Sequence, residues 1–89
     1  MHRVKLTPGA QRQLDRLSAA QFERVTAALR SLGDNPRPIG IKKLRRSIYR
    51  IRVGNWRVIY SIQDKESLVV VGRIARRSED TCDGVDDLF

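Results

Sequence analysis

The stretch that decides the fold of this chain is Ile48-Tyr49-Arg50-Ile51-Arg52-Val53, followed by Gly54-Asn55 and then by Trp56-Arg57-Val58-Ile59-Tyr60-Ser61-Ile62. Alternation of apolar with polar or basic residues at a period of two is typical of a β-strand with one buried face. Glycine at the first central position suits a two-residue type II′ turn. The stretch therefore predicts an antiparallel β-hairpin.

Pairing around this turn divides the hairpin into two unlike faces, because residues two apart share a face. One face is expected to pack in the core and consists of Tyr49, Ile51, Val53, Trp56, Val58 and Tyr60. The other is expected to carry Arg50, Arg52 and Arg57 together with Ile59 and Ser61. The grouping depends on the register, since a slip of one residue would scatter the arginines.

The same register places Arg52 directly opposite Arg57. Like charges that face each other destabilise a sheet, and local conflicts of this kind tend to mark functional sites. A bridging phosphate would turn the repulsion into bidentate hydrogen bonds. The alternatives are that both guanidinium groups extend into water, or that they pair with acids such as Asp64 or those of the C-terminal segment.

Towards the N-terminus, the pattern predicts a short strand over residues 2–6 and then two helices. Thr7-Pro8 has the pattern of an N-cap followed by proline at the first helical position, and this helix is expected to run to about Ser18. Ser18 and Gln21 have the spacing of a capping box that opens the second helix, and Gly33 is expected to end it. Such a tight connection predicts an antiparallel helical hairpin. The apolar stripe expected to reach the core from the second helix is Phe22, Val25, Leu29 and Leu32.

Towards the C-terminus, residues 68–74 predict a third strand after a turn at residues 63–67, and Asp80 to Phe89 predict a short helix or a loose tail. The expected fold class is α+β: an N-terminal strand, a two-helix hairpin and then an antiparallel sheet, in the order β-α-α-β-β-β. At 89 residues, the chain is expected to form a single domain over residues 1–89.

Charge is distributed unevenly along the chain. Eighteen Lys and Arg against ten Asp and Glu give a net charge of +8. All of the basic residues lie in residues 1–77, whereas residues 78–89 hold five acids and no base. A concentrated positive field attracts polyanions, above all nucleic acid. An acidic partner protein, or a basic face that only keeps the protein in solution, would also account for it, and the acidic segment would either fold over the basic face or stay solvated.

Several classes of protein do not fit this composition. One cysteine excludes an internal disulfide, and with one histidine it does not support a Cys/His metal site. A catalytic triad or a histidine pair would have to depend on His2, close to the chain's start. No apolar run approaches the roughly 20 residues of a membrane helix, and the N-terminus lacks the apolar segment of a signal peptide. We therefore expect a cytoplasmic protein that uses neither metal nor other cofactor.

Two consecutive segments strongly resemble the RelE/ParE toxin family of bacterial and archaeal toxin–antitoxin systems. They are Pro38-Ile39-Gly40-Ile41-Lys42-Lys43-Leu44 and the hairpin from Tyr49 to Tyr60. The closing Ile74-Ala75-Arg76-Arg77-Ser78-Glu79-Asp80 is similar to the family's basic C-terminal segment. The resemblance covers nearly the whole chain and implies the RelE-like microbial ribonuclease fold. The hairpin pattern is specific to the superfamily and much less so to its branches.

The resemblance implies one of two activities. RelE-like members cut mRNA in the ribosomal A site without a metal, by attack of a ribose 2′-OH on the neighbouring phosphate, and basic residues stabilise the additional negative charge. ParE-like members bind and poison DNA gyrase. We expect a RelE-like mRNA endonuclease that inhibits translation; a ParE-like gyrase inhibitor is the alternative, and an inactive RNA-binding relative is a third.

Carried over by position, the resemblance implies the catalytic residues Arg50, Arg52, Arg57 and Arg76. Arg57 and Arg76 would bind the scissile phosphate, and Arg50 and Arg52 would bind and polarise the RNA. Further contacts to RNA are expected from Lys42, Lys43, Arg45, Arg46, Arg73 and Arg77.

Cys82 departs from the family pattern. RelE-like nucleases often have a tyrosine six residues beyond the C-terminal arginine, where its ring stacks on a base and helps with proton transfer. A thiol does not stack, although a thiolate can act as a base where positive charge favours its ionisation. The departure leaves open a weak nuclease, a nuclease with another base, a chain without catalysis and a separate branch.

The resemblance also implies partners. These are a cognate antitoxin, the ribosome with its mRNA, and a toxin–antitoxin hetero-oligomer that acts on operator DNA through the antitoxin. No membrane is expected among them.

Overall fold

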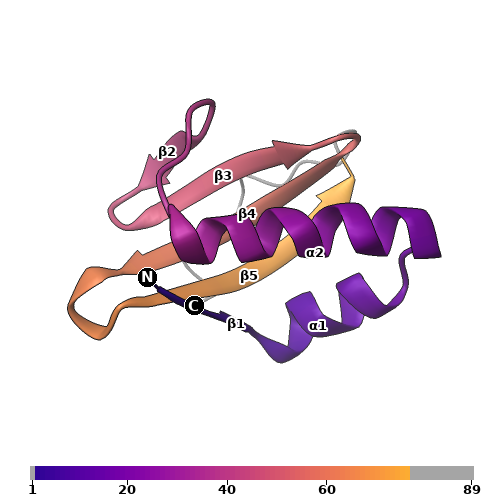
Figure 1. Cartoon of the computed structure of the whole chain (residues 1–89), viewed down its shortest axis with the longest axis horizontal. Coiled ribbons are helices and arrows are strands. Elements are labelled where there is room, and N and C mark those ends of the chain that lie inside the picture. Colours follow the sequence, from indigo (N-terminus) through magenta and orange to yellow (C-terminus); the bar gives the residue numbers. More distant parts are fainter. Residues whose placement is uncertain (1, 77–89) are drawn as a thin grey trace.

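A computed structural model describes residues 2–76, which form a five-stranded sheet with two helices packed on it (Figure 1). The elements follow in the order β1 (Arg3–Leu6), α1 (Pro8–Asp15), α2 (Ala19–Asp34), β2 (Lys42–Arg45), β3 (Ile48–Val53), β4 (Trp56–Gln63), the 3-10 turn η1 (Asp64–Glu66) and β5 (Leu68–Arg76). The α+β class predicted from the sequence is confirmed.

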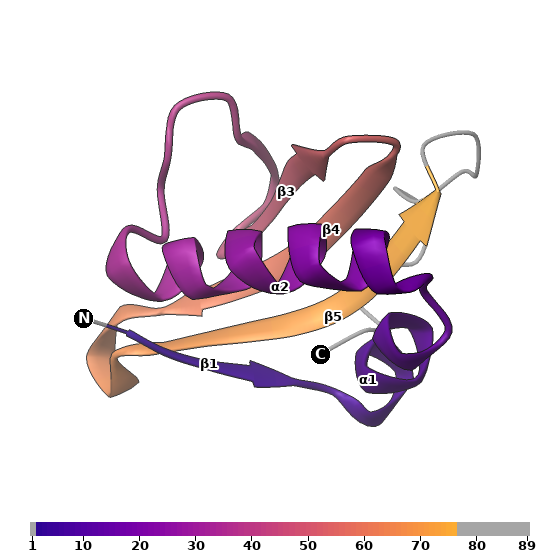
Figure 2. The ribbon, with the colours of Figure 1, turned by 45° about the vertical axis from the view of Figure 1, so that its right-hand side comes forward.

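Side-chain caps begin both helices where the sequence predicts them. Thr7 Oγ1 accepts a hydrogen bond from the backbone N–H of Ala10 at 3.2 Å, and Pro8 stands at the start of α1. Ser18 Oγ accepts from the N–H of Gln21 at 3.5 Å and caps α2. Figure 2 shows α1 nearly in cross-section while α2 runs across the view, so the helix axes cross as they leave their short connection.

Gly33 does not end α2, contrary to the prediction. The helix continues to Asp34, and Gly33 is absent from the residues with positive φ. The position is instead one of close approach: a Cβ on Gly33 would lie 2.9 Å from the carbonyl oxygen of His2, whose own N–H donates to the Gly33 carbonyl at 2.7 Å. Glycine is therefore required here because the start of the chain passes against the last turn of the helix.

The hairpin of β3 and β4 agrees with the predicted register at each pair, from Val53–Trp56 at the turn to Tyr49–Tyr60. Gly54 adopts φ +60° and Asn55 is not among the residues with positive φ, as a type II′ turn requires. Glycine is favoured at this position because side chains of L residues rarely adopt φ +60°.

The sheet is mixed and has one strand more than the sequence predicts. Its order is β1-β5-β4-β3-β2, with β1 parallel to β5 and the other neighbours antiparallel. The extra strand is β2, an edge strand of mostly basic residues whose pairing with β3 shifts register between Lys43 and Arg45. A strand of this composition gives no apolar alternation, so its pairing appears only in the tertiary structure.

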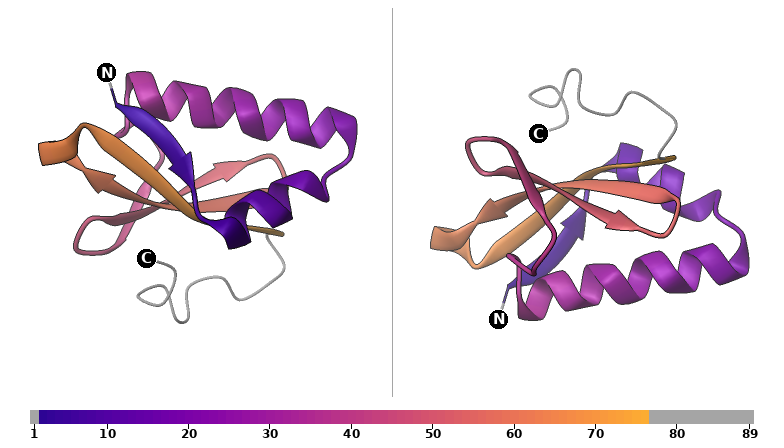
Figure 3. Two further views of the ribbon diagram at one scale, coloured as in Figure 1. Left: turned by 90° about the horizontal axis from the view of Figure 1, so that it is seen from below. Right: turned by 90° about the horizontal axis from the view of Figure 1, so that it is seen from above.

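The main core lies between the helices and one face of the sheet. Its fully buried members include Val25 and Leu32 of α2 and Val58 and Tyr60 of β4, and Trp56 and Tyr49 pack against it. The predicted apolar face of the hairpin is thereby confirmed. Figure 3 shows α2 along this face of the twisted sheet.

Phe22 is not a core residue, contrary to the prediction. Its side chain is 38% exposed, and the buried positions of α2 begin one turn later, at Val25. The first turn of α2 thus contributes capping but little burial. Neither helix in residues 2–76 has the length and apolar character needed to span a membrane.

Candidate functional site

The face of the sheet away from the helices carries the arginines of the hairpin. Arg52 pairs with Arg57 across β3 and β4, and Arg50 pairs with Ile59. The intervening residues, such as Val58, pack in the main core, so the arginines point to the opposite side. Arg50 and Arg57 are half-buried and Arg52 is exposed. We call this side of strands β2 to β5 the outer face.

Strand β5 adds a fourth arginine to the outer face. The pairing of β4 with β5 steps from Tyr60–Val71 to Ile59–Arg73, so Gly72 is an extra residue of the kind that makes a β-bulge. The bulge sets Arg73 beside Ile59, in the same cross-strand row as Arg50.

Strand β2 extends this row by pairing Lys42 with Arg50. Lys42, Arg50, Ile59 and Arg73 therefore cross the sheet in one line. The place of Lys42 and Arg73 beside Arg50 depends on an edge strand and a bulge that the sequence did not reveal.

Arg76 lies on the other side of the sheet from this group. It pairs with Trp56, and its guanidinium carbon lies 5.7 Å from the centre of the indole ring, a distance typical of a cation–π contact. Trp56 packs against the main core, whereas Ala75 takes the position beside Arg57. The period of two after the Gly72 bulge thus gives Arg73 to the outer face and Arg76 to the helix side.

The other predicted RNA-binding residues are spread around β2. Lys43 pairs with Tyr49, whose ring lies on the helix side, and Arg45 pairs with Ile48. Arg46 is exposed in the following turn with φ +47°. Arg77 and Cys82 lie outside the described residues.

Acidic side chains are absent from the strands of the outer face. Within residues 2–76 the acids are Asp15, Glu23, Asp34, Asp64 and Glu66, and none of these lies in β2 to β5. The outer face is therefore a region of positive potential, which favours anionic ligands. In the same part of the chain, no three His, Cys, Asp or Glu side chains gather to hold a metal ion.

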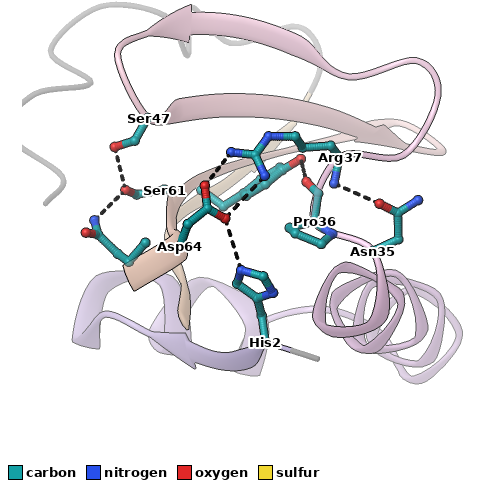
Figure 4. A network of polar contacts seen from close by, with 9 residues as sticks. His2, Asn35, Pro36, Arg37, Ser47, Ser61 and Asp64 are labelled. Atoms are coloured by element: carbon teal, nitrogen blue, oxygen red, sulfur yellow. Dashed lines mark hydrogen bonds and ion pairs between the residues drawn. The ribbon is translucent and has the colours of Figure 1, made fainter. Parts of the chain in front are cut away.

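Asp64 belongs to a separate polar cluster beyond the end of β4 (Figure 4). Arg37 donates to it through Nη2 at 2.8 Å and Nη1 at 3.3 Å, and His2 Nε2 lies 3.2 Å from its Oδ1. The hydrogen bonds from Arg37, and then from His2, hold the pKa of Asp64 below its ordinary value of 3.8. Asp64 is thus engaged by Arg37 and His2, and the alternative that it neutralises Arg52 and Arg57 is not what the structure shows.

The same cluster fixes the segment that connects α2 to β2. Tyr60 donates from its hydroxyl to the carbonyl of Pro36 at 2.9 Å, and its ring stacks on Tyr49 at 6.0 Å between centroids. Arg37 covers the Tyr49 ring at 5.9 Å. Burial raises the pKa of Tyr60 to about 12, so the phenol stays a donor over the physiological range.

Comparison with known families identifies the chain. Residues 4–81 match the model of the ParE toxin of type II toxin-antitoxin system, parDE. The chain belongs to the RelE/ParE toxin family. It is accordingly a toxin of a type II toxin–antitoxin system.

Solved structures of RelE toxins share this toxin's fold. A chain of the archaeal RelE-RelB complex from Pyrococcus horikoshii is 27% identical, with a TM-score of 0.80, over 88% of this chain and 97% of that one. A chain of the toxin-antitoxin complex RelBE2 from Mycobacterium tuberculosis is 29% identical, with a TM-score of 0.76, over 85% and 98%.

The isolated E. coli RelE toxin matches over 100% of both chains with a TM-score of 0.79. At 16% identity, this likeness shows the fold alone. A comparison with curated proteins finds no match for this toxin.

Proposed function

We propose that this toxin is a ribosome-dependent mRNA endonuclease that inhibits translation. The single observation that carries the proposal is the gathering of Arg50, Arg52 and Arg57 on the outer face. Cleavage by a ribose 2′-OH needs little beyond positioning and stabilisation of the additional negative charge on the phosphate. Fixed guanidinium groups supply both, because they bind phosphate oxygens in a bidentate manner and stay charged.

Arg57 would hold the scissile phosphate, and Arg50 and Arg52 would bind and polarise the flanking RNA. Arg76 contacts Trp56 on the helix side, so it would reach an RNA held on the outer face only around the end of the sheet. The remaining contacts to RNA are proposed for Lys42, Lys43, Arg45, Arg46, Arg73 and Arg77, and Cys82 stands where related nucleases often have tyrosine.

Proton transfer is the step for which the described residues offer no ordinary group. Arginine is a poor general base because it does not lose its proton in proteins. His2 contacts Asp64 in the cluster beyond β4 and belongs to a different part of the molecule from Arg57. The proposal therefore assigns most of the rate enhancement to charge stabilisation and to positioning by the ribosome.

The proposed partners are a cognate antitoxin, the ribosome and mRNA. The solved RelE-RelB and RelBE2 relatives are complexes of a toxin with its antitoxin, which supports the first of these. An antitoxin that presents acidic side chains to the outer face would compete with RNA for it. Repression of operator DNA by the hetero-oligomer, and a cytoplasmic location, belong to the same proposal.

A ParE-like gyrase inhibitor is the second candidate, and the match of residues 4–81 to the ParE toxin family favours it. In that case the outer face would bind an acidic protein surface in place of RNA. The two candidates share the fold and the arginines but predict different damage in the cell.

Induced expression followed by mapping of mRNA 5′ ends separates the candidates. A nuclease produces new ends within translated codons soon after induction, and these ends disappear when translation is blocked beforehand. A gyrase inhibitor leaves mRNA intact and induces the response to DNA damage. Growth arrest with intact mRNA and trapped gyrase–DNA complexes would transfer the proposal to gyrase.

A further inference from the structure

Strand β4 contains a buried serine on the outer face. Ser61 is 2% exposed and is the buried polar side chain among residues 2–76. It shares the outer face with Arg57 and Ile59, because residues two apart along a strand point to the same side. A polar side chain that is buried in a sheet normally has its hydrogen bonds satisfied by neighbouring groups.

The hydrogen bonds of Ser61 link three side chains (Figure 4). Its Oγ accepts from Nε2 of Gln63 at 2.8 Å and lies 3.1 Å from Oγ of Ser47. Ser47 comes from the turn between β2 and β3, so the two hydroxyls join neighbouring strands. The contact fixes the orientation of the Gln63 amide, with its nitrogen towards Ser61.

The Gln63 amide keeps hydrogen-bonding capacity for an outside ligand. Its side chain is half-buried and makes no other hydrogen bond within residues 2–76. One N–H and the carbonyl oxygen therefore remain available. A donor beside an acceptor complements the N7 and N6 edge of adenine, which glutamine recognises in nucleic acids. Holding the amide in advance lowers the entropy that binding would cost.

Gln63 lies on the same face as the arginines, displaced along β4 from the row of Arg50 and Arg73. The row of Arg50 and Arg73 crosses β4 at Ile59, and Gln63 follows four residues later, about 13 Å along the strand. Contacts to phosphate position a nucleic acid, and contacts to base edges specify its sequence. An RNA strand held by the arginines can thus present a neighbouring base at Gln63.

We propose that Gln63 selects the base next to the bound phosphates, with a preference for adenine, and that Ser61 is the positioning residue that orients its amide. The inference rests on the proposed function to the extent that RNA is the ligand of the outer face. It adds a specificity determinant beyond the row of Lys42, Arg50 and Arg73 on that face.

Binding of single-stranded RNA oligonucleotides that differ at one position tests the inference. The affinities for A, C, G and U at that position are measured at one salt concentration for the full chain and for the variants Gln63→Met and Ser61→Ala. Gln11→Met is the matched control, because Gln11 is an exposed glutamine on α1 that contacts Asp15.

We expect the unmodified toxin to prefer adenine by about tenfold. Gln63→Met abolishes the preference while the mean affinity for RNA changes less than twofold, because the arginines are intact. Ser61→Ala weakens the preference, and Gln11→Met leaves it unchanged. A toxin without base preference, or a Gln63→Met variant that keeps it, overturns the inference.

Mapping of cut sites in a translation system with the same variants separates this inference from the proposed function. If the toxin cuts mRNA and Gln63→Met keeps the same cut-site sequences, the inference fails and the endonuclease stands. If the base preference depends on Gln63 but no mRNA is cut, the endonuclease fails and the inference stands. If Gln63→Met weakens antitoxin binding and leaves RNA selectivity intact, Gln63 contacts the protein partner and the inference is wrong.

Discussion

The two faces of β3 and β4 come from alternate residues of the same strands, yet they differ in what surrounds them. On the helix side, Val58 and Tyr60 are wholly buried beneath α2 and its neighbours. On the outer face, Arg50, Arg52 and Arg57 lie where no helix of residues 2–76 covers the sheet. Burial of apolar surface stabilises the first face by roughly 25 cal/mol per Å², whereas the second carries charge. Stability and recognition are therefore separable by single substitutions at adjacent positions of the same strand.

The largest expected effect falls on the outer face. Arg57→Ala should abolish toxicity, with mRNA cleavage in a translation system reduced by about 10²–10³-fold, the usual cost of removing one group that stabilises a charged transition state. The thermal transition should stay cooperative. Arg12→Ala, on the exposed side of α1, is the charge-matched control and should remain fully toxic. Undiminished killing by Arg57→Ala would remove that arginine from the mechanism.

A substitution on the helix side should have the opposite profile. Leu32 is 0% exposed in the main core, so Leu32→Ala should lower the free energy of unfolding by about 3 kcal/mol through lost burial and a cavity. Urea denaturation measures the change. The activity of the fraction that remains folded should equal that of the parent toxin, and a specific loss of cleavage without loss of stability would contradict the separation of the faces.

Tyr60 tests the boundary between the core and the polar cluster. Tyr60→Phe removes the hydrogen bond to the Pro36 carbonyl and should cost about 1 kcal/mol at neutral pH. Since the folded-state pKa is raised from 10.0 to about 12, the stabilisation is fully present below pH 10 and is lost as pH rises through about 12. Urea midpoints at neutral and alkaline pH should therefore converge for the two proteins. A constant difference across this range would mean that the phenol is not the titrating group.

The smallest effect is expected at Asp64. Its carboxylate is exposed and its pKa is lowered by Arg37 and His2, so its contribution is present above pH 3.8 and is lost as pH falls through the lower folded-state pKa. Asp64→Asn should lower the melting temperature slightly at neutral pH and not at all in strong acid. Asp15→Asn, at an exposed acid on α1, is the control. Equal shifts for both variants would show that the cluster adds nothing beyond net charge.

Local pattern was enough to predict the hairpin and the helix starts. The alternation around Gly54-Asn55 gave the register, since one face had to be apolar and only one pairing achieves that. Thr7 and Ser18 predicted the helix starts because their caps act within a few residues. Of the candidate site, the common face of Arg50, Arg52 and Arg57 followed from the same alternation.

Contacts between distant parts of the chain could not be predicted in this way. Gly33 carries no local sign that His2 passes within a Cβ's reach of it. The bulge at Gly72 shifts the alternation along β5, and this shift puts Arg73 on the outer face and Arg76 on the helix side. Phe22 has the spacing of a core residue but lies before the part of α2 that the sheet covers.

By itself, the sequence determined a basic hairpin with one apolar and one cationic face, because the alternation of side chains is a property of the strand alone. Only the tertiary structure decided which further cations join the cationic face. It also decided that Asp64 accepts hydrogen bonds from Arg37 and that the Gln63 amide donates to Ser61. Those outcomes depend on strand order, a bulge and loop positions. Long-range packing sets all three, and none of them produces a periodic pattern in the sequence.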